Sequence, residues 1–384
     1  QIVPWSGPAG LVFTDGTVLG ACLDRFGLRP LRYQLFNDNY FVLASEVGVL
    51  ADRNSLVKQE GRLGPSEILE INLDTGSISF DKAVKTRIAQ KHPYKQAVRG
   101  RHISLPFYDT PKKIDFSNNP ILTIKDKKLR QFHTAFGYSK DCLKMVFLNK
   151  AITGKELVYS MGSDIPVAIF SYFPKRLFDY FKQRFAQVSN PALDSIREQI
   201  HLSIKSFLGP KHSIFSNPTS QHKIYFNNHS ILSPSSFDVI VKGKFKHLAA
   251  KRIDCTEKII EGKINFKHAL KHICNDIDHA IHQGVGIIIL SDKNMSKTTV
   301  ALPSLLVCST VHQHLIKTQQ RYKVSLIIES GEVYDSHHVA CLFAYGANGI
   351  YPYLAYITLN EAIKNSYIPQ LSFAEATFNY IKAM

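Results

Sequence analysis

The sequence predicts an α/β protein in which an antiparallel β layer is followed by a domain of mainly parallel strands. Three observations lead to this prediction. Short apolar runs alternate with turn dipeptides up to about residue 80, whereas longer apolar runs alternate with helical patterns beyond about residue 120. Of the 384 residues, 45% are hydrophobic and 20% are charged, which is the composition of a folded protein and not of a disordered one.

The first part of the chain has the pattern of three β-hairpins. Asp15-Gly16 separates the first two strands, and this dipeptide is a strong signal for a two-residue hairpin turn. Residues 37–39 and 74–76 are also rich in turn-forming side chains. The six strands are expected at residues 11–13, 18–23, 31–36, 40–44, 68–73 and 77–80.

A basic stretch follows the hairpins. Residues 82–101 carry seven Lys and Arg side chains and no acidic one, and the apolar periodicity fades there. We expect a linker or an exposed strap to begin in this stretch. Such a run is most often a solvated face, and the alternative is a surface for an acidic protein or a nucleic acid.

Helices and buried strands alternate in the second part. A helix is expected from Pro174 to Asn190, because Leu177, Phe181 and Phe185 recur at helical spacing. Further along, residues 285–290 and 324–329 are continuous apolar strands, residues 305–316 form a helix between them, and residues 340–345 and 350–354 continue the alternation. Continuous strands separated by helices imply a parallel sheet that is covered on both faces.

A helix expected between residues 265 and 283 carries His268, His272, Asp276, His279 and His282. The first two histidines are four residues apart, a spacing that can bind a metal. However, all five side chains fall within about 120° of arc opposite the apolar stripe, so we expect them to face solvent. The pairs at 312/314 and 337/338 are not spaced for shared binding, and we expect them to pack or cap helices.

Composition excludes several classes of protein. The six cysteines are scattered without a CxxC pair and lie mostly in apolar runs, so we expect them to be reduced and buried. No apolar run reaches the roughly 18 residues that a membrane span needs. The formal net charge of +16 suggests a basic nucleic-acid-binding module as a second hypothesis. The basic residues are dispersed and the aromatic residues follow apolar patterns, so no nucleic acid is expected as a partner.

The densest cluster of charge lies in the loop of residues 20–33. Asp24, Arg25 and Arg29 crowd a turn that glycine and proline shape, and we expect these charges to pair. The loop either pins the adjacent strands or faces a substrate. No nucleophile elbow, phosphate-binding loop or zinc-binding helix motif occurs, so the residues alone indicate no catalytic site.

An ordered series of motifs is similar to the glutamate synthase large (alpha) subunits. In the first part, residues 5–9, 24–33, 44–49 and 61–65 resemble the closing part of the amidotransferase domain of that family. In the second part, residues 160–164, 180–191, 329–332, 337–338, 345–347 and 352–355 resemble its central domain. The resemblance spans nearly the whole chain and is weakest at residues 103–148 and 213–257.

The resemblance implies a domain organisation and an activity. Residues 1–102 would be the C-terminal part of an N-terminal-nucleophile amidotransferase domain, residues 103–150 a divergent linker, and residues 151–384 the central α/β domain. The full-length enzyme makes L-glutamate from L-glutamine and 2-oxoglutarate by glutamine hydrolysis, internal ammonia transfer and flavin-dependent reduction of 2-iminoglutarate. Because the sequence starts at Gln1 and not at Met, we expect an internal piece of a longer chain that supplies scaffold and domain coupling.

The resemblance also implies cofactors and partners. FMN and a three-iron four-sulfur cluster are expected beyond this stretch, so no catalytic, cofactor-binding or metal-binding residue is expected within it. The expected partners are the FMN-binding barrel of the same polypeptide and either ferredoxin or an NAD(P)H-oxidising small subunit. The lysine-, isoleucine- and asparagine-rich composition favours a plastid stroma over a cytoplasm, and both are reducing compartments.

The candidate residues are therefore structural. In the first part they are Asp24, Arg25, Arg29 and Glu46. In the second part, polar groups beside an apolar stripe suggest an interdomain contact formed by Lys182, Gln183, Phe185, Gln187 and Asn190. Phe26 stands where the family usually has Asn, and this difference could change the backbone conformations that the charged loop tolerates.

Overall fold

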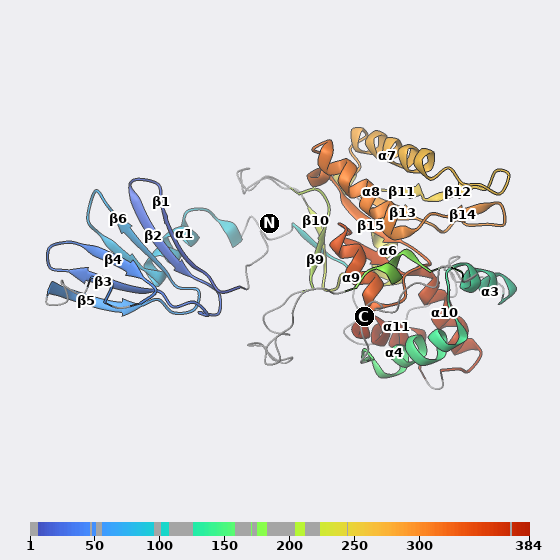
Figure 1. Ribbon diagram of the computed structural model, residues 1–384, viewed down its shortest axis with the longest axis horizontal. Helices are drawn as coiled ribbons and strands as arrows, with labels where there is room; N and C mark the ends of the chain where they lie inside the picture. The colour runs from blue at the N-terminus through green and yellow to red at the C-terminus, as the bar shows by residue number, and fades with distance from the viewer. Residues whose placement is uncertain are drawn as a thin grey trace. The chain divides into compact units, whose positions relative to one another are not determined.

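The computed structural model describes residues 7–46, 48–50, 56–95, 101–106, 126–157, 170, 175–182, 204–211, 223–243, 245–368 and 371–384. These residues belong to two compact units, of which the first contains the described residues up to 95 and the second those from 101 onward (Figure 1). In neither unit do the described residues include a helix long and apolar enough to cross a membrane.

The first unit contains two antiparallel sheets. One has the strand order β1 (Gly10–Thr14), β2 (Val18–Leu23), β6 (Ile68–Asn72) and β7 (Ile78–Phe80), and the other has the order β4 (Phe41–Ala44), β3 (Arg32–Phe36) and β5 (Val57–Arg62). The three expected hairpins are confirmed. The sequence did not predict β5, because its residues 58–60 are all polar and exposed and give no alternating pattern.

We expected a linker or an exposed strap to begin at residue 82. This expectation is wrong for its first part, because residues Asp81–Gln90 form the helix α1. Its single buried residue is Val84, so the helix has almost no apolar periodicity. Polar contacts fix it to the sheet instead. Asp81 accepts a hydrogen bond from the backbone N–H of Ile68 at 3.2 Å and pairs with Lys85 at 2.6 Å.

The second unit is built on a parallel sheet. Its strands β11 (Ala250–Asp254), β13 (Ile287–Ser291), β15 (Ser325–Glu329) and β16 (Gly349–Tyr351) lie side by side in this order. All residues of β13, β15 and β16 are buried. The prediction of continuous apolar strands in a parallel sheet is therefore confirmed.

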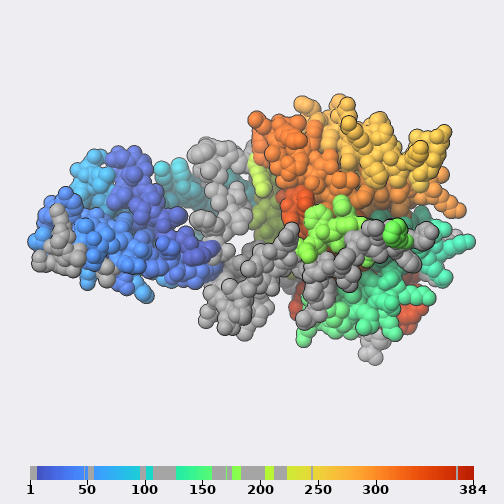
Figure 2. Space-filling model, viewed as in Figure 1, coloured from blue at the N-terminus to red at the C-terminus, as the bar shows by residue number. Residues whose placement is uncertain are grey.

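Helices cover both faces of this sheet. The connections between successive strands run through α7 (Phe266–His282), α8 (Ser304–Lys317) and α9 (Ser336–Ala344), and right-handed crossovers place these three on one face. In Figure 2, α7 and α8 belong to the yellow and orange part of the surface. On the other face lies α6 (Pro234–Val241), whose Phe237 ring stacks on Tyr351 with a centroid distance of 3.9 Å.

Further elements surround the sheet. A small sheet has the order β8 (His102–Ser104), β10 (Ile224–Asn227) and β9 (Ser206–Leu208), and β12 (Thr256–Lys258) pairs with β14 (Thr299–Ala301). Within the segment 103–150 lie α3 (Asp126–Ala135), a π-helix (Cys142–Phe147) and the start of α4 (Leu148–Thr153). The chain continues through α10 (Tyr353–Lys364) and α11 (Phe373–Ala383), and α11 packs on α4.

The helix expected from Pro174 is wrong where the structure describes it. Leu177–Tyr180 (η4) is a single 3₁₀ turn, and Phe181 after it is extended, with φ −104° and ψ 139°. Phe178 is fully buried, and its carbonyl accepts hydrogen bonds from the backbone N–H of Phe181 and from His337 Nε2 at 3.1 and 3.0 Å. These bonds replace the regular α-helical bond to that carbonyl.

The orientation expected for the histidine-rich helix is confirmed. In α7, His268, His272, His279 and His282 are exposed, whereas Ile273, Ile277 and Ala280 are buried on the opposite side. Asn265 caps the helix by accepting a hydrogen bond from the backbone N–H of His268 at 3.1 Å. The two histidines at 337 and 338 pack in the interior at the start of α9, as expected.

Candidate functional site

The charged loop of the first unit is organised around Asp24. Its carboxylate is buried and accepts backbone N–H bonds from Ala9, Phe26, Leu28 and Arg29 at 3.4, 3.1, 2.9 and 3.0 Å. Burial acts to raise the pKa of this carboxyl group, but the four N–H donors outweigh it and hold the pKa below its ordinary value. The carboxylate therefore fixes the loop internally and to Ala9 just before β1, and backbone amides take the place that we expected the arginines to take at Asp24.

The other residues of this loop lie at its surface. Arg25 and Arg29 are exposed, and the guanidinium of Arg25 lies 5.6 Å from the centre of the Phe26 ring. The left-handed backbone position belongs to Gly27, with φ 66°, and not to Phe26. The aromatic residue therefore causes no strain in the turn.

Asp24→Ala should lower the local stability of this loop by about 2 kcal/mol, because four backbone N–H groups lose a charged acceptor. Asp15→Ala is the matched control, since Asp15 also accepts two backbone N–H bonds, from Thr17 and Val18, but at an exposed turn. Hydrogen exchange at residues 26–29 should accelerate in the Asp24 variant. Unchanged exchange there would contradict the assigned pinning role.

The remaining sequence candidates belong to different units or lie outside the described residues. Glu46 and Lys182 are both exposed and belong to different units. Gln183, Phe185, Gln187 and Asn190 lie outside the described residues. Lys182 follows Phe181, whose ring meets Tyr345 edge-on at 5.4 Å.

The richest polar cluster lies at the carboxyl edge of the parallel sheet. Asp292, directly after β13, is buried and accepts hydrogen bonds from Ser330 Oγ and from the backbone N–H of Gly331, the latter at 3.0 Å. Burial raises the pKa of Asp292 to about 7 although both donors act against this shift. This carboxyl group is thus poised to ionise near neutral pH.

Glu332 forms the second half of this cluster. Its Oε2 accepts hydrogen bonds from the backbone N–H and the hydroxyl of Ser304 at 3.0 and 2.7 Å, and so it caps the start of α8. Burial raises the pKa of Glu332 as well. A cavity of about 10 Å³ remains between Asp292, Ser304 and Ser330, which is about the space of one water molecule.

An ion pair lies at the same carboxyl edge of the parallel sheet. Glu329, at the end of β15, has no exposed surface and binds Arg252 of β11 through two hydrogen bonds of 2.6 and 3.2 Å. The Arg252 side chain is 40% exposed and lies over the Phe237 ring at 5.8 Å. The pair therefore ties two strands together across β13.

A buried lysine connects the helices beside the sheet. Lys150 of α4 has no exposed surface, and its ammonium group lies 2.9 Å from Glu156 and 3.4 Å from Asp335. The hydroxyl of Ser336 and the sulfur of Met384 lie 3.4 and 3.5 Å from it. Asp335 caps α9, and Met384 follows α11, so one side chain joins three helices.

Comparison with models of known protein families shows which family this chain belongs to. The model described as glutamate synthase central domain matches residues 131–384, about two thirds of the chain. The chain belongs to the glutamate synthase central domain family. The model for class-II glutamine amidotransferases matches residues 1–97. The predicted glutamate synthase resemblance is therefore confirmed.

Individual glutamate synthases match almost the whole chain. The ferredoxin-dependent glutamate synthase of Pyropia yezoensis is 35% identical over 99% of the chain, and ferredoxin-dependent glutamate synthase 1 of Arabidopsis thaliana, described as chloroplastic/mitochondrial, is 34% identical over 100%. The NADPH glutamate synthase large chain of Bacillus subtilis is 36% identical over 99%. The chain spans about a quarter of the length of these curated relatives.

The cofactors implied for glutamate synthases do not fit the described residues. An iron–sulfur cluster needs several cysteine thiolates together. Among the described residues, no group of three His, Cys, Asp or Glu side chains could hold a metal ion. Four of the six cysteines are buried, and burial raises the pKa of Cys274 to about 11 and that of Cys308 to about 12, which keeps these thiols protonated. At the edge of the sheet, the cavity of about 10 Å³ is far too small for a flavin.

The sequence analysis did not single out Asp292 and Lys150, two buried charged residues of this glutamate synthase domain. Asp292 gave a usable signal, because an acidic residue directly after a continuous apolar strand lies at the carboxyl edge of a parallel sheet. Lys150 gave none, because Asp335, one of its partners, is 185 residues away in the sequence. Only the tertiary fold brings such a pair together.

Proposed function

We propose that this chain forms the closing part of the amidotransferase domain and the central domain of a glutamate synthase large subunit, and that it acts there as scaffold and coupling element. In that enzyme, glutamine hydrolysis gives glutamate and ammonia. The ammonia moves within the protein to 2-oxoglutarate, and reduced flavin converts the resulting 2-iminoglutarate to a second glutamate. The two family matches support this assignment.

The observation that carries the scaffold role is the filled edge of the parallel sheet. Open α/β sheets bind ligands beyond the carboxyl ends of their strands. Here Asp292, Glu329 and Glu332 occupy that edge and are satisfied by Ser330, Arg252 and Ser304. A domain whose usual ligand position holds its own side chains is suited to fix distances between neighbouring domains.

The proposal extends to cofactors, partners and compartment. FMN and a three-iron four-sulfur cluster would belong to an FMN-binding barrel elsewhere in the same polypeptide, and ferredoxin would donate the electrons. An NAD(P)H-oxidising small subunit is the alternative donor, because relatives of both kinds are similarly identical to the chain, at 35% and 36%. A plastid stroma is the proposed compartment, on the basis of chloroplastic plant relatives.

Domain limits and an interdomain contact are also part of the proposal. We place the end of the amidotransferase part near residue 102, the linker at 103–150 and the central part from 151. The match to amidotransferases, which ends at residue 97, supports the first limit, whereas the match to the central domain already begins at residue 131. The contact would lie around Lys182, Gln183, Phe185, Gln187 and Asn190. Tyr180 at its start is 57% exposed next to the buried Phe178, which suits a surface that a neighbouring domain covers.

The test places this chain in the matched region of the Bacillus subtilis large chain and measures glutamate formed per glutamine consumed. A coupled enzyme forms two glutamates, whereas glutamine hydrolysis alone forms one. Tyr180→Ala should move the ratio towards one without unfolding the enzyme. Tyr367→Ala is the control, because Tyr367 is also exposed, at 69%, but lies elsewhere in the second unit.

Two outcomes would contradict these proposals separately. If the hybrid folds and hydrolyses glutamine but never forms the second glutamate, the proposed coupling role is wrong. If Tyr180→Ala and Tyr367→Ala leave the same ratio, the coupling role survives and the interdomain contact at residues 180–190 is wrong.

A further inference from the structure

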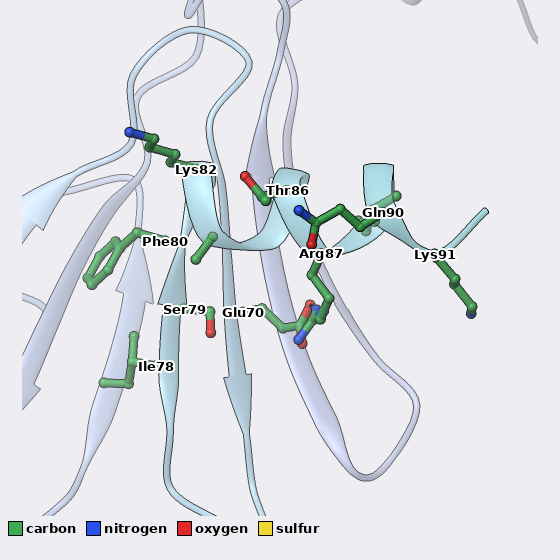
Figure 3. A pocket seen from close by; sticks show the side chains of 11 residues that line it. Glu70, Ile78, Ser79, Phe80, Lys82, Thr86, Arg87, Gln90 and Lys91 are labelled. Carbon is green, nitrogen blue, oxygen red and sulfur yellow. Dashed lines mark hydrogen bonds and ion pairs between the residues drawn. The ribbon is translucent and has the colours of Figure 1, made fainter. Parts of the chain in front are cut away.

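The first unit has an open hollow that the proposed function does not use. It lies between α1 and β7 and has a volume of about 1260 Å³ (Figure 3). The lining residues of α1 include Lys82, Arg87 and Ile88, and those of β7 include Ile78 and Phe80. All of them are described residues of a single unit, so the hollow does not depend on how the units are arranged.

The charge of the lining is basic. Its only acidic residue is Glu70, and Figure 3 shows Arg87 reaching it from α1 to form an ion pair. Lys82 in the first turn of α1 and Lys91 directly after the helix are exposed, and in the described part of the chain neither forms an ion pair. Two uncompensated positive charges therefore border the hollow at the two ends of α1.

The hollow also exposes apolar side chains that a folded unit would normally cover. Val84 and Ile88 are four residues apart and lie on the same face of α1, but Val84 is buried whereas Ile88 is 48% exposed. Phe80 is 39% exposed, although its ring contacts Tyr33 at 5.5 Å. The apolar face of the helix thus continues past the part that the sheet covers.

The backbone of β7 is open at this place. Among the described residues, β7 is the last strand of its sheet and pairs with β6 alone. The N–H of Asn72 donates to the carbonyl of Ser77, so the alternation of an antiparallel ladder directs the N–H groups of Ile78 and Phe80 away from β6. These groups are placed to pair with an additional strand.

We propose that this hollow binds an extended acidic polypeptide segment, which adds to the edge of β7. The two faces of the sheet differ in a way that specifies the sequence of this segment. Ile78 and Phe80 point to one face, whereas Glu70 and Ser79 point to the face where Arg87 and the rest of α1 lie. An added strand would therefore place apolar residues beside Ile78 and Phe80 and acidic residues, in alternation, towards the basic helix.

The test titrates the 384-residue chain into a fluorescein-labelled peptide in which Glu alternates with Val and Ile, and follows the anisotropy. Saturable binding is expected. Two further peptides separate the contributions. One has Gln in place of each Glu, and the other carries N-methyl groups on the backbone that would pair with β7. Both should bind at least about tenfold more weakly, through lost charge complementarity and lost strand pairing.

Two pairs of protein variants locate the surface. Lys82→Glu/Lys91→Glu should weaken binding by about tenfold, and Lys127→Glu/Lys128→Glu on α3 is the control with the same change in net charge. Phe80→Ser should weaken binding by about fivefold, because Phe80 points to the face that takes the apolar residues of the segment, and Ile152→Ser on α4 is its control, since the exposed fractions of the two side chains are 39% and 47%. All these side chains are exposed, so folding is expected to be preserved.

Several results would overturn the inference. The acidic peptide could fail to bind up to millimolar concentration, or the Gln peptide could bind equally well. The control pair on α3 could lower the affinity as much as the pair on α1 does. Finally, a single-stranded oligonucleotide could displace the peptide at lower concentration, which would mean that the surface recognises phosphate and not an acidic strand.

Discussion

Lys150→Ala should lower the free energy of unfolding of the second unit by about 3–5 kcal/mol. The substitution removes an ammonium group without exposed surface from between Glu156 and Asp335. Asp335, whose side chain is 17% exposed, would keep a charge with little access to water. The lost side chain would also leave a cavity between α4, α9 and α11, which adds to the cost.

Lys150→Met separates the two contributions, because methionine restores most of the volume without the charge. Its free energy of unfolding should lie between that of Lys150→Ala and that of the parent chain. The surface control is Lys364→Ala, whose partner Glu361 lies one helical turn away and whose own side chain is 53% exposed; a change below about 0.5 kcal/mol is expected. Hydrogen exchange in α4 and α11 reports the second unit specifically. A Lys150→Met variant as stable as the parent chain would contradict the proposed role of the ion pairs.

Asp292→Asn should make the stability of the second unit less dependent on pH. The pKa of Asp292 is raised to about 7 in the folded chain from an ordinary value of 3.8, so the folded state holds the proton more tightly than the unfolded state. The stability that the protonated carboxyl provides is complete below about pH 4, is lost progressively as the pH rises to about 7, and changes no further where both states are ionised. This three-unit difference corresponds to roughly 4 kcal/mol.

The hydrogen-bond donors that face Asp292, Ser330 and Gly331, oppose the rise of its pKa but do not reverse it. Burial is the main cause, and the nearby carboxyl of Glu332 adds to it. Urea unfolding at pH 5 and pH 8, followed by hydrogen exchange in β13, should show a large loss for the parent chain and a smaller one for Asp292→Asn. Asp254→Asn, at the exposed end of β11, is the control and should retain the parent dependence. Equal slopes for all three chains would mean that Asp292 is already ionised at pH 5.

Sequence patterns were sufficient where a structure is repetitive. The hairpin that turns at Asp15-Gly16 and the buried strands β13 and β15 follow from local periodicity, and all three lie in the structure where they were expected. The patterns failed where contacts from distant parts of the chain decide. Helix α1 is fixed by Asp81 and Arg87 to β6, and η4 ends because the carbonyl of Phe178 meets His337. Neither contact has a counterpart in local periodicity.

The candidate residues show the same division. Asp24 was recognisable because its loop is dense in charge, although the sequence suggested arginines as its partners and the structure provides backbone amides. Lys150 was not recognisable, and Glu332 was noticed only as part of the motif at residues 329–332, without a structural role. Each owes its position to a residue from another element, Asp335 for Lys150 and Ser304 for Glu332. A single sequence contains the types of these residues but not their proximity.

The strand order of the parallel sheet limits which ligands this domain could be redesigned to bind. In nucleotide-binding sheets, neighbouring strands send their helices to opposite faces, and a crevice for the ligand opens at that switch point. The described strands β11, β13, β15 and β16 follow one another across the sheet in chain order, so α7, α8 and α9 all turn to the same face. No such crevice opens between these neighbours. Redesign for a flavin would therefore have to change the connections themselves, whereas emptying the carboxylate cluster would only destabilise the sheet.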